Sequence, residues 1–192
     1  MRIRSKIVGL GVASAAVVGL TLGLYMARAS AESSERSLLT LDRTLREDFD
    51  RNAKLEVETT ISMLQLIADR AARGEINLDE AKRQGAALLR GLRYGKDGYF
   101  WADTVDGTNV VLLGRADEGK NRLQKTDSGG KRFVEEFLSK GRAGGGFIDY
   151  TFTRVAGGAP VPKRAYTLQF APFGWVVGTG NYVDDIDALV GK

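Results

Sequence analysis

The most constraining feature of this chain is the stretch formed by residues 32–73, which contains neither proline nor glycine. Apolar residues recur through it at spacings of three and four, which is the period of one helix face. The members of this stripe are Leu38, Leu41, Leu45, Phe49, Ala53, Val57, Ile61, Leu64, Ala68 and Ala71. We therefore predict a single helix of about 60 Å, ended by Gly74.

A helix of that length exceeds what one small domain can cover, and 192 residues leave room for one domain plus an anchor. We predict that its first half stands free near a membrane or pairs with a second copy of the chain in a homodimeric stalk. The alternative is a helix bent back over its own domain, in which the apolar stripe is a core face.

An uncharged run, residues 7–27, precedes this helix and is about as long as a bilayer is thick. Its flanking basic residues are Arg2, Arg4, Lys6 and Arg28. By the positive-inside rule, residues 1–6 are cytoplasmic, and residues 7–27 anchor the chain in the inner membrane as a single span. A cleaved signal peptide is the alternative, because residues 29–31 read Ala-Ser-Ala. Both alternatives place the domain that follows in the periplasm or outside the cell.

Composition removes several classes of function. The chain has no histidine and no cysteine, so zinc sites of Cys and His, thiol nucleophiles and histidine triads are excluded. Four of the 28 basic residues and none of the 24 acidic ones lie in the first thirty residues, so 24 of each remain in the rest. Without a basic run or a basic helix face, we expect no nucleic-acid partner.

Acid/base catalysis by paired carboxylates would need two carboxyl groups close together, with apolar surroundings that raise the pKa of one of them. Asp184, Asp185 and Asp187 follow the last predicted strand, but no apolar sequence surrounds them to raise a pKa. We expect a solvated segment there. Because no nucleophile and base occur together, we predict no enzyme, no catalytic residue, no cofactor and no metal site.

The remaining sequence predicts an α+β domain with a PAS-like antiparallel sheet of about five strands. Asn77 with Glu80 reads as the cap of a second helix that runs to about Arg90. The strand signals cover residues 99–103, 109–113, 147–153, 164–170 and 175–180, with a short helix at 131–139. We expect the glycines at 144–146, 178 and 180 to permit tight backbone packing.

Aromatic and cationic side chains concentrate on the predicted strands. The set comprises Tyr99, Trp101, Tyr150, Lys163, Tyr166, Trp175 and Tyr182, with Arg93 and Arg115 nearby in sequence. A cation at the mouth of an apolar pocket, with tyrosine hydroxyls converging on it, suits a small carboxylate, because a buried charge requires a partner. The alternative is that the aromatic residues are plain core.

Six segments carry a pattern shared with a known family: residues 92–101, 106–108, 119–121, 144–150, 162–166 and 174–186. In this order they resemble the single Cache domain of bacterial methyl-accepting chemotaxis receptors and sensor kinases, over roughly residues 32–187. The block Gly-Trp-x-x-Gly-Thr-Gly-x-Tyr-x-x-Asp-Ile, which begins at Gly174, is the most diagnostic. Residues 188–192 are left as a tail.

The resemblance implies a long N-terminal helix, a PAS-like sheet and an extracytoplasmic sensor of small organic acids with two to four carbons. It implies that Tyr99 and Trp101 wall the pocket and that Lys163 with Tyr166 holds the carboxylate. Many members have His-Pro where this chain has leucines at 112 and 113, so Arg115 is the expected substitute contact. The expected ligand-binding residues are Tyr99, Trp101, Arg115, Tyr150, Lys163 and Tyr166.

Lys163 and Tyr166 are three residues apart, which places them on opposite faces of a regular strand. Both reach one pocket only if Lys163 still belongs to the turn after Pro162.

A receptor would continue past residue 187 with a second membrane span and a cytoplasmic signalling module. We expect either a receptor fragment or a free-standing, membrane-tethered Cache protein that signals through a partner membrane protein. The alternative function is a structural or interaction protein that is membrane-tethered and dimerises through its long helix.

Overall fold

The computed structural model describes residues 2–155 and 157–189, without the side chains of residues 2–17, 31, 34, 35, 186, 188 and 189. The chain divides into two compact units, residues 1–44 and 45–192. The first unit consists of the N-terminal part of helix α1 (Arg2–Ala72). The helix predicted for residues 32–73 is therefore confirmed up to residue 72, and Gly74 follows with a φ of 75°.

Across the described residues, no helix is both long and apolar enough to cross a membrane. The predicted span at residues 7–27 includes residues 7–17, whose side chains lie outside the described part of the chain. The span therefore stays a prediction.

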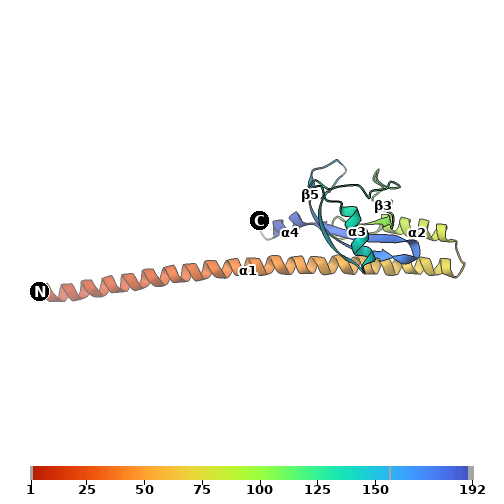
Figure 1. Ribbon diagram of the computed structural model, residues 1–192. Helices are drawn as coiled ribbons and strands as arrows, with labels where there is room; N and C mark the ends of the chain where they lie inside the picture. The colour runs from red at the N-terminus through yellow and green to blue at the C-terminus, as the bar shows by residue number, and fades with distance from the viewer. Residues whose placement is uncertain (1, 156, 190–192) are drawn as a thin grey trace. The chain divides into compact units, whose positions relative to one another are not determined.

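The second unit contains the rest of α1, three further α-helices and the sheet (Figure 1). Helix α2 (Leu78–Gly91) begins as predicted, because Asn77 Oδ1 accepts a hydrogen bond of 2.8 Å from the backbone N–H of Glu80. Helix α3 (Phe133–Arg142) follows the predicted position within a few residues. Helix α4 (Val183–Leu189), which the sequence analysis did not predict, follows the last strand.

The sheet has six antiparallel strands rather than about five. They are β1 (Arg93–Tyr94), β2 (Gly98–Thr104), β3 (Asn109–Leu112), β4 (Gly146–Thr153), β5 (Pro160–Phe170) and β6 (Trp175–Tyr182). Their order is β1-β2-β6-β5-β4, and β3 also pairs with β2. The additional strand is β1, whose two residues are too short to produce an alternating pattern.

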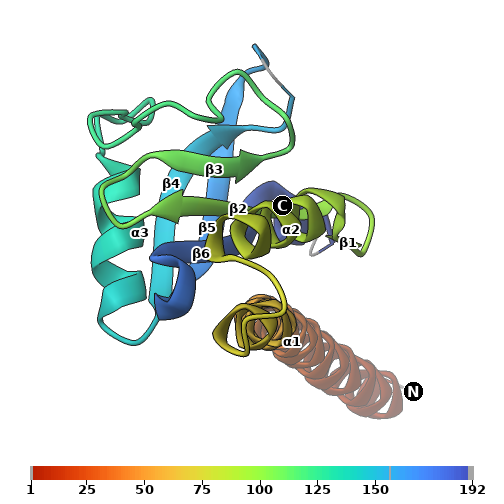
Figure 2. The ribbon, with the colours of Figure 1, turned by 90° about the vertical axis from the view of Figure 1, so that its right-hand side faces the viewer.

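Helices cover the two faces of this sheet separately (Figure 2). One face packs against α2 and the last turns of α1, and its core includes Leu64, Leu89 and Trp175. The opposite face packs against α3, through Phe133 and Phe137. The apolar stripe of α1 is thus a core face of this unit from Ala53 onward, whereas the predictions for the first half of the helix stay predictions.

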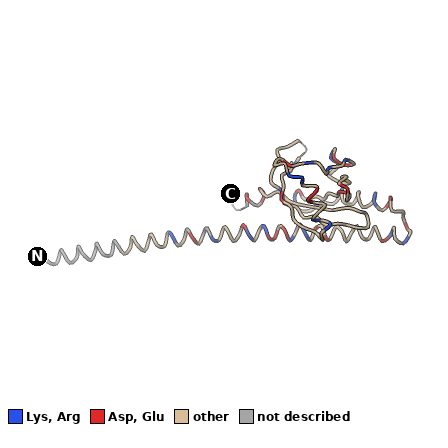
Figure 3. Tube along the Cα trace, in the orientation of Figure 1, with Lys and Arg blue, Asp and Glu red and all other residues tan. Residues whose placement is uncertain are grey.

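Acidic and basic residues are interspersed along the described trace of this unit (Figure 3). Arg164 on β5 illustrates the consequence, because its guanidinium group pairs with Asp50 on α1 and Asp149 on β4, each at 2.7 Å. The mixed surface stabilises contacts between elements.

Candidate functional site

The register of the sheet gathers the candidate residues on the face covered by α3. Lys163 on β5 lies opposite Tyr150 on β4 and opposite Tyr182 on β6. Because directly paired residues of neighbouring strands project to the same face, these three side chains share one environment. Trp101 joins them from β2, where it pairs with Gly178.

Gly178 explains why a tryptophan fits at this place in the sheet. A Cβ atom at position 178 would lie 2.5 Å from Cζ2 of Trp101. The missing side chain therefore lets the indole ring lie against strand β6. Gly180 is similarly confined, since a Cβ atom there would lie 2.4 Å from the carbonyl oxygen of Arg164. The predicted tight packing of these glycines is confirmed.

Lys163 is only 1% exposed and is enclosed by aromatic rings. Its Nζ donates a hydrogen bond of 2.8 Å to the Tyr99 hydroxyl. The ring centroids of Tyr99, Tyr182, Trp101 and Phe152 lie 4.2, 4.9, 5.3 and 5.6 Å from Nζ. Faces of aromatic rings attract a cation but do not replace a counter-ion.

The electrostatic surroundings of Lys163 disfavour its charged form. Burial lowers the pKa of its ammonium group well below the usual range, and the guanidinium groups of Arg115 and Arg154 lower it further. Within the described part of the chain, no carboxylate lies within 4 Å of Lys163 or Arg115. This side of the domain therefore holds the Arg115 cation and the buried Lys163 amine, neither with a carboxylate partner among the described residues.

One further polar group of this cluster lacks a hydrogen-bond partner among the described residues. The indole Nε1 of Trp101 is buried and unpaired. Beside it, burial raises the pKa of the Tyr150 hydroxyl well above the usual value, so this group stays neutral. Unpaired buried donors are costly, and they indicate that an acceptor is missing.

A cavity of about 350 Å³ adjoins the cluster. Its lining includes Arg115, Phe133 and Phe152, together with the loops that follow β3 and β4. Lys163 does not line it, but the Phe152 ring of its wall lies near both charged groups. The ring centroid is 5.6 Å from Nζ of Lys163 and 5.4 Å from Cζ of Arg115. A cavity of this size accommodates a small organic molecule.

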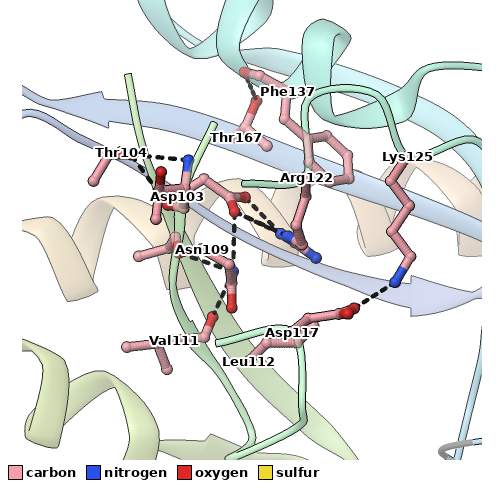
Figure 4. A network of polar contacts seen from close by, with 12 residues as sticks. Asp103, Thr104, Asn109, Val111, Leu112, Asp117, Arg122, Lys125, Phe137 and Thr167 are labelled. Carbon is pink, nitrogen blue, oxygen red and sulfur yellow. Dashed lines mark hydrogen bonds and ion pairs between the residues drawn. The ribbon is translucent and has the colours of Figure 1, made fainter. Parts of the chain in front are cut away.

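The loop after β3 is fixed to the sheet by a buried ion pair (Figure 4). Arg122 donates two hydrogen bonds of 2.7 Å to the two carboxylate oxygens of Asp103, and both side chains are almost fully buried. Asn109 donates to Asp103 Oδ1 at 2.9 Å. In the same loop, Lys125 pairs with Asp117 at the wall of the cavity. The ion pair thus holds the loop that carries Arg115.

Arg115 is oriented by the loop after β4. Its guanidinium group donates to the carbonyl oxygen of Arg154 at 2.8 Å and more weakly to that of Thr153. Tyr182 closes the same corner, since its hydroxyl donates to the Thr153 carbonyl at 2.9 Å. These bonds leave the Arg115 charge without an anionic partner among the described residues.

The structure does not bring Tyr166 to this cluster. Lys163 lies within β5 rather than in a turn, so Tyr166 projects to the opposite face. There it packs with Ala53 and Val57 of α1. The other five predicted site residues, Tyr99, Trp101, Arg115, Tyr150 and Lys163, lie on the α3 side or at its edge.

Three residues of the cluster were not among the predicted site residues. Phe152 lies two residues after Tyr150 on β4 and therefore projects to the same face. Tyr182 pairs with Lys163 between β6 and β5, so the strand register would have indicated it. Arg154 stacks on Tyr182, with Cζ 4.1 Å from the ring centroid, and pairs with Asp184 and Asp185 of α4. No local sequence pattern indicates that contact.

The three aspartates after the last strand lie in α4, where Asp184 and Asp185 are exposed, as predicted. Asp184 and Asp185 pair with Arg154, and Asp187 pairs with Arg46 of α1 at 2.7 Å. These ion pairs were not predicted, because the partners lie far away in sequence.

Residues 45–192 match the family described as Single Cache domain 2. The chain is 30% identical, over 98% of its length, to the sensor histidine kinase MctS of Rhizobium johnstonii. It is 32% identical, over 72% of its length, to the methyl-accepting chemotaxis protein CtpM of Pseudomonas aeruginosa. It covers 40% and 25% of those proteins and thus less than half of either.

Solved structures agree with this assignment. A periplasmic sensor domain of a chemotaxis protein is 37% identical, with a TM-score of 0.70, and the alignment covers 74% of this chain and 99% of that one. A Cache chemosensory domain, described for its recognition of carboxylic acid, is 25% identical with the same TM-score and covers 74% and 98%. The chain therefore belongs to the Single Cache domain 2 family of sensor domains.

Proposed function

We propose that this domain is an extracytoplasmic sensor that binds a carboxylate of two to four carbons between Lys163 and Arg115. The observation that carries the proposal is that Lys163 is buried without a carboxylate partner among the described residues. A ligand carboxylate would supply the missing charge. It would also give acceptors to the unpaired N–H of Trp101 and the hydroxyl of Tyr150.

The ligand enters this site from the adjoining cavity in our proposal. Phe152 separates the cavity from Lys163, and it is only half-buried. Rotation of its ring would join the two spaces. The carboxylate then lies among the cations, and the short carbon chain occupies the apolar wall formed by Phe133 and Phe152. The volume of about 350 Å³ suits a small acid.

The relatives support a sensory role. Two of them are a sensor histidine kinase and a chemotaxis protein, and one solved relative recognises carboxylic acid. We extend this to the present chain as a non-catalytic sensor anchored in the inner membrane by residues 7–27. It would pass its signal to a cytoplasmic signalling module or to a partner membrane protein.

A homodimer formed through α1 completes the proposal. Leu38 and Leu41 of the apolar stripe are 52% and 45% exposed within the described chain, so they are free to contact a second copy. Ligand binding can shift the state of such a dimer only through its different affinity for the two conformations.

Thermal unfolding of the full chain tests the carboxylate site. Acetate, propionate, pyruvate, lactate and succinate would be compared with neutral amides and amines at matched pH and ionic strength. A ligand at 100 times its Kd adds about 2.7 kcal/mol of stability. That corresponds to a rise in Tm of roughly 5–10 °C for a domain of this size. A folded protein whose Tm no carboxylate changes would favour the alternative of a structural protein that dimerises through its helix.

A further inference from the structure

We infer that ligand binding at Lys163 is coupled to the uptake of one proton, so that the site captures a carboxylate anion together with a proton. This inference rests on the proposed carboxylate site and concerns its regulation. It would make the response of the sensor depend on external pH as well as on ligand concentration.

The hydrogen bonds of Lys163 fit either protonation state. Nζ has one hydrogen-bond partner among the described residues, the Tyr99 hydroxyl at 2.8 Å. A phenol hydroxyl can both donate and accept. A neutral amine therefore accepts this bond from Tyr99, whereas an ammonium group donates it. An ammonium group would place its two other N–H groups against aromatic rings, which give a buried charge less stabilisation than a carboxylate partner would.

The charged groups around Lys163 do not compensate a buried positive charge. From the sheet it faces the neutral hydroxyls of Tyr99, Tyr150 and Tyr182, on β2, β4 and β6. Helix α3 presents the apolar rings of Phe133 and Phe137 to this cluster.

The charged groups come from the loops and from α4. Arg115 and Arg154 are both cations and oppose the charge on Lys163. The carboxylates on this side, Asp184 and Asp185, are exposed and pair with Arg154. Asp103 forms a closed pair with Arg122. The ligand-free site therefore favours a neutral Lys163.

Binding of an anion reverses this preference. A carboxylate next to Nζ stabilises the ammonium form, so the pKa of Lys163 rises from its lowered value. The added proton forms a new N–H bond at Nζ and comes from the buffer, and nothing is oxidised or reduced. The affinity is greatest below the ligand-free pKa. It falls about tenfold for each pH unit between the ligand-free and the ligand-bound pKa.

Calorimetric titration of the full chain tests the coupling directly. Pyruvate, acetate and succinate would each be titrated at pH 7.5 in HEPES and in Tris, which differ in their enthalpy of ionisation. We expect the binding heat to differ between the buffers in the sense of net proton uptake by the protein. Binding with the same heat in both buffers would overturn the coupling alone. A lack of binding by all three acids would contradict the proposed site as well.

Two variants and a ligand-free measurement complete the test. Lys163→Met removes the amine, whereas Lys120→Met removes an exposed amine outside the site and should keep the full proton uptake. In NMR titrations of chains labelled at lysine Cε, the resonance lost in Lys163→Met should titrate well below the other lysines. Titration of that resonance together with the exposed lysines would overturn the inference without any ligand present.

Discussion

The amine of Lys163 lies 2.8 Å from the Tyr99 hydroxyl in the interior of the domain, and the described residues offer it no carboxylate. A buried cation usually has an anionic partner, because the desolvation of an unpaired charge costs several kcal/mol. The domain therefore maintains a group that lowers its own stability. Such a cost is typical of a residue retained for binding.

Replacing Lys163 by methionine should stabilise the ligand-free protein. The pKa of Lys163 is lower in the folded than in the unfolded state, so the unfolded chain binds more protons and folding stability rises with pH between the two values. Lys163→Met removes this penalty, which is about 1.4 kcal/mol for each pKa unit of the shift. Urea unfolding at pH 6 and pH 8.5 should show a gain that is larger at pH 6. A less stable variant at both pH values would contradict the prediction.

Arg115→Gln should weaken carboxylate binding by roughly ten- to a hundredfold, the usual contribution of a hydrogen bond to a charged group. Arg115 has no anionic partner of its own among the described residues, so its loss should change folding stability little. Arg132→Gln is the matched control, because Arg132 is exposed and pairs only with Glu135 among them. Equal affinities of the two variants, measured by calorimetry, would remove Arg115 from the site.

Phe152→Ala should change which acids bind. The Phe152 ring lines the cavity and its centroid is 5.6 Å from Nζ of Lys163, so in our proposal its removal joins the two spaces. We expect the affinity for four- and five-carbon acids to rise relative to that for acetate. Thermal unfolding against a series of straight-chain carboxylates would measure the shift. An unchanged order of affinities would mean that the carbon chain does not pass Phe152.

Gly178→Ala should destabilise the domain by about 1–3 kcal/mol, because the new methyl group overlaps the Trp101 ring. Displacement of that ring should also weaken binding. Gly91→Ala, at the end of α2, is the control, since a Cβ atom there meets nothing within 4 Å. Urea midpoints of the two variants would separate a local clash from the general effect of an added methyl group. Equal midpoints would contradict the packing argument.

Periodicity predicted much of this fold, because the elements are amphipathic and bounded by glycine or a helix cap. The α1 stripe, the Asn77 cap and five strands followed from spacing alone. Strand β1 was not predicted, because two residues are too few to show an alternating pattern of apolar and polar side chains. Helix α4 was not predicted either, because contacts with Arg154 and Arg46 hold it, and those residues are distant in sequence.

Most residues of the candidate site could be predicted from the sequence, but their positions relative to one another could not. Alternation along β5 correctly indicated that Lys163 and Tyr166 point to opposite faces of the sheet. Tyr166 lies on the α1 side, away from the cluster around Lys163. Phe152 and Tyr182 depend on the register between β4, β5 and β6, which residue types do not reveal. The absence of a carboxylate near Lys163 is likewise a three-dimensional property.

The most direct test of the carboxylate site compares the full chain with its Lys163→Met variant, each with and without saturating pyruvate, acetate or succinate. We predict that the variant is the more stable of the two without ligand. We also predict that at least one acid raises the Tm of the full chain by several degrees and leaves the Tm of the variant unchanged. A ligand-induced rise of equal size in both proteins would contradict the assignment of Lys163 as the residue that holds the carboxylate.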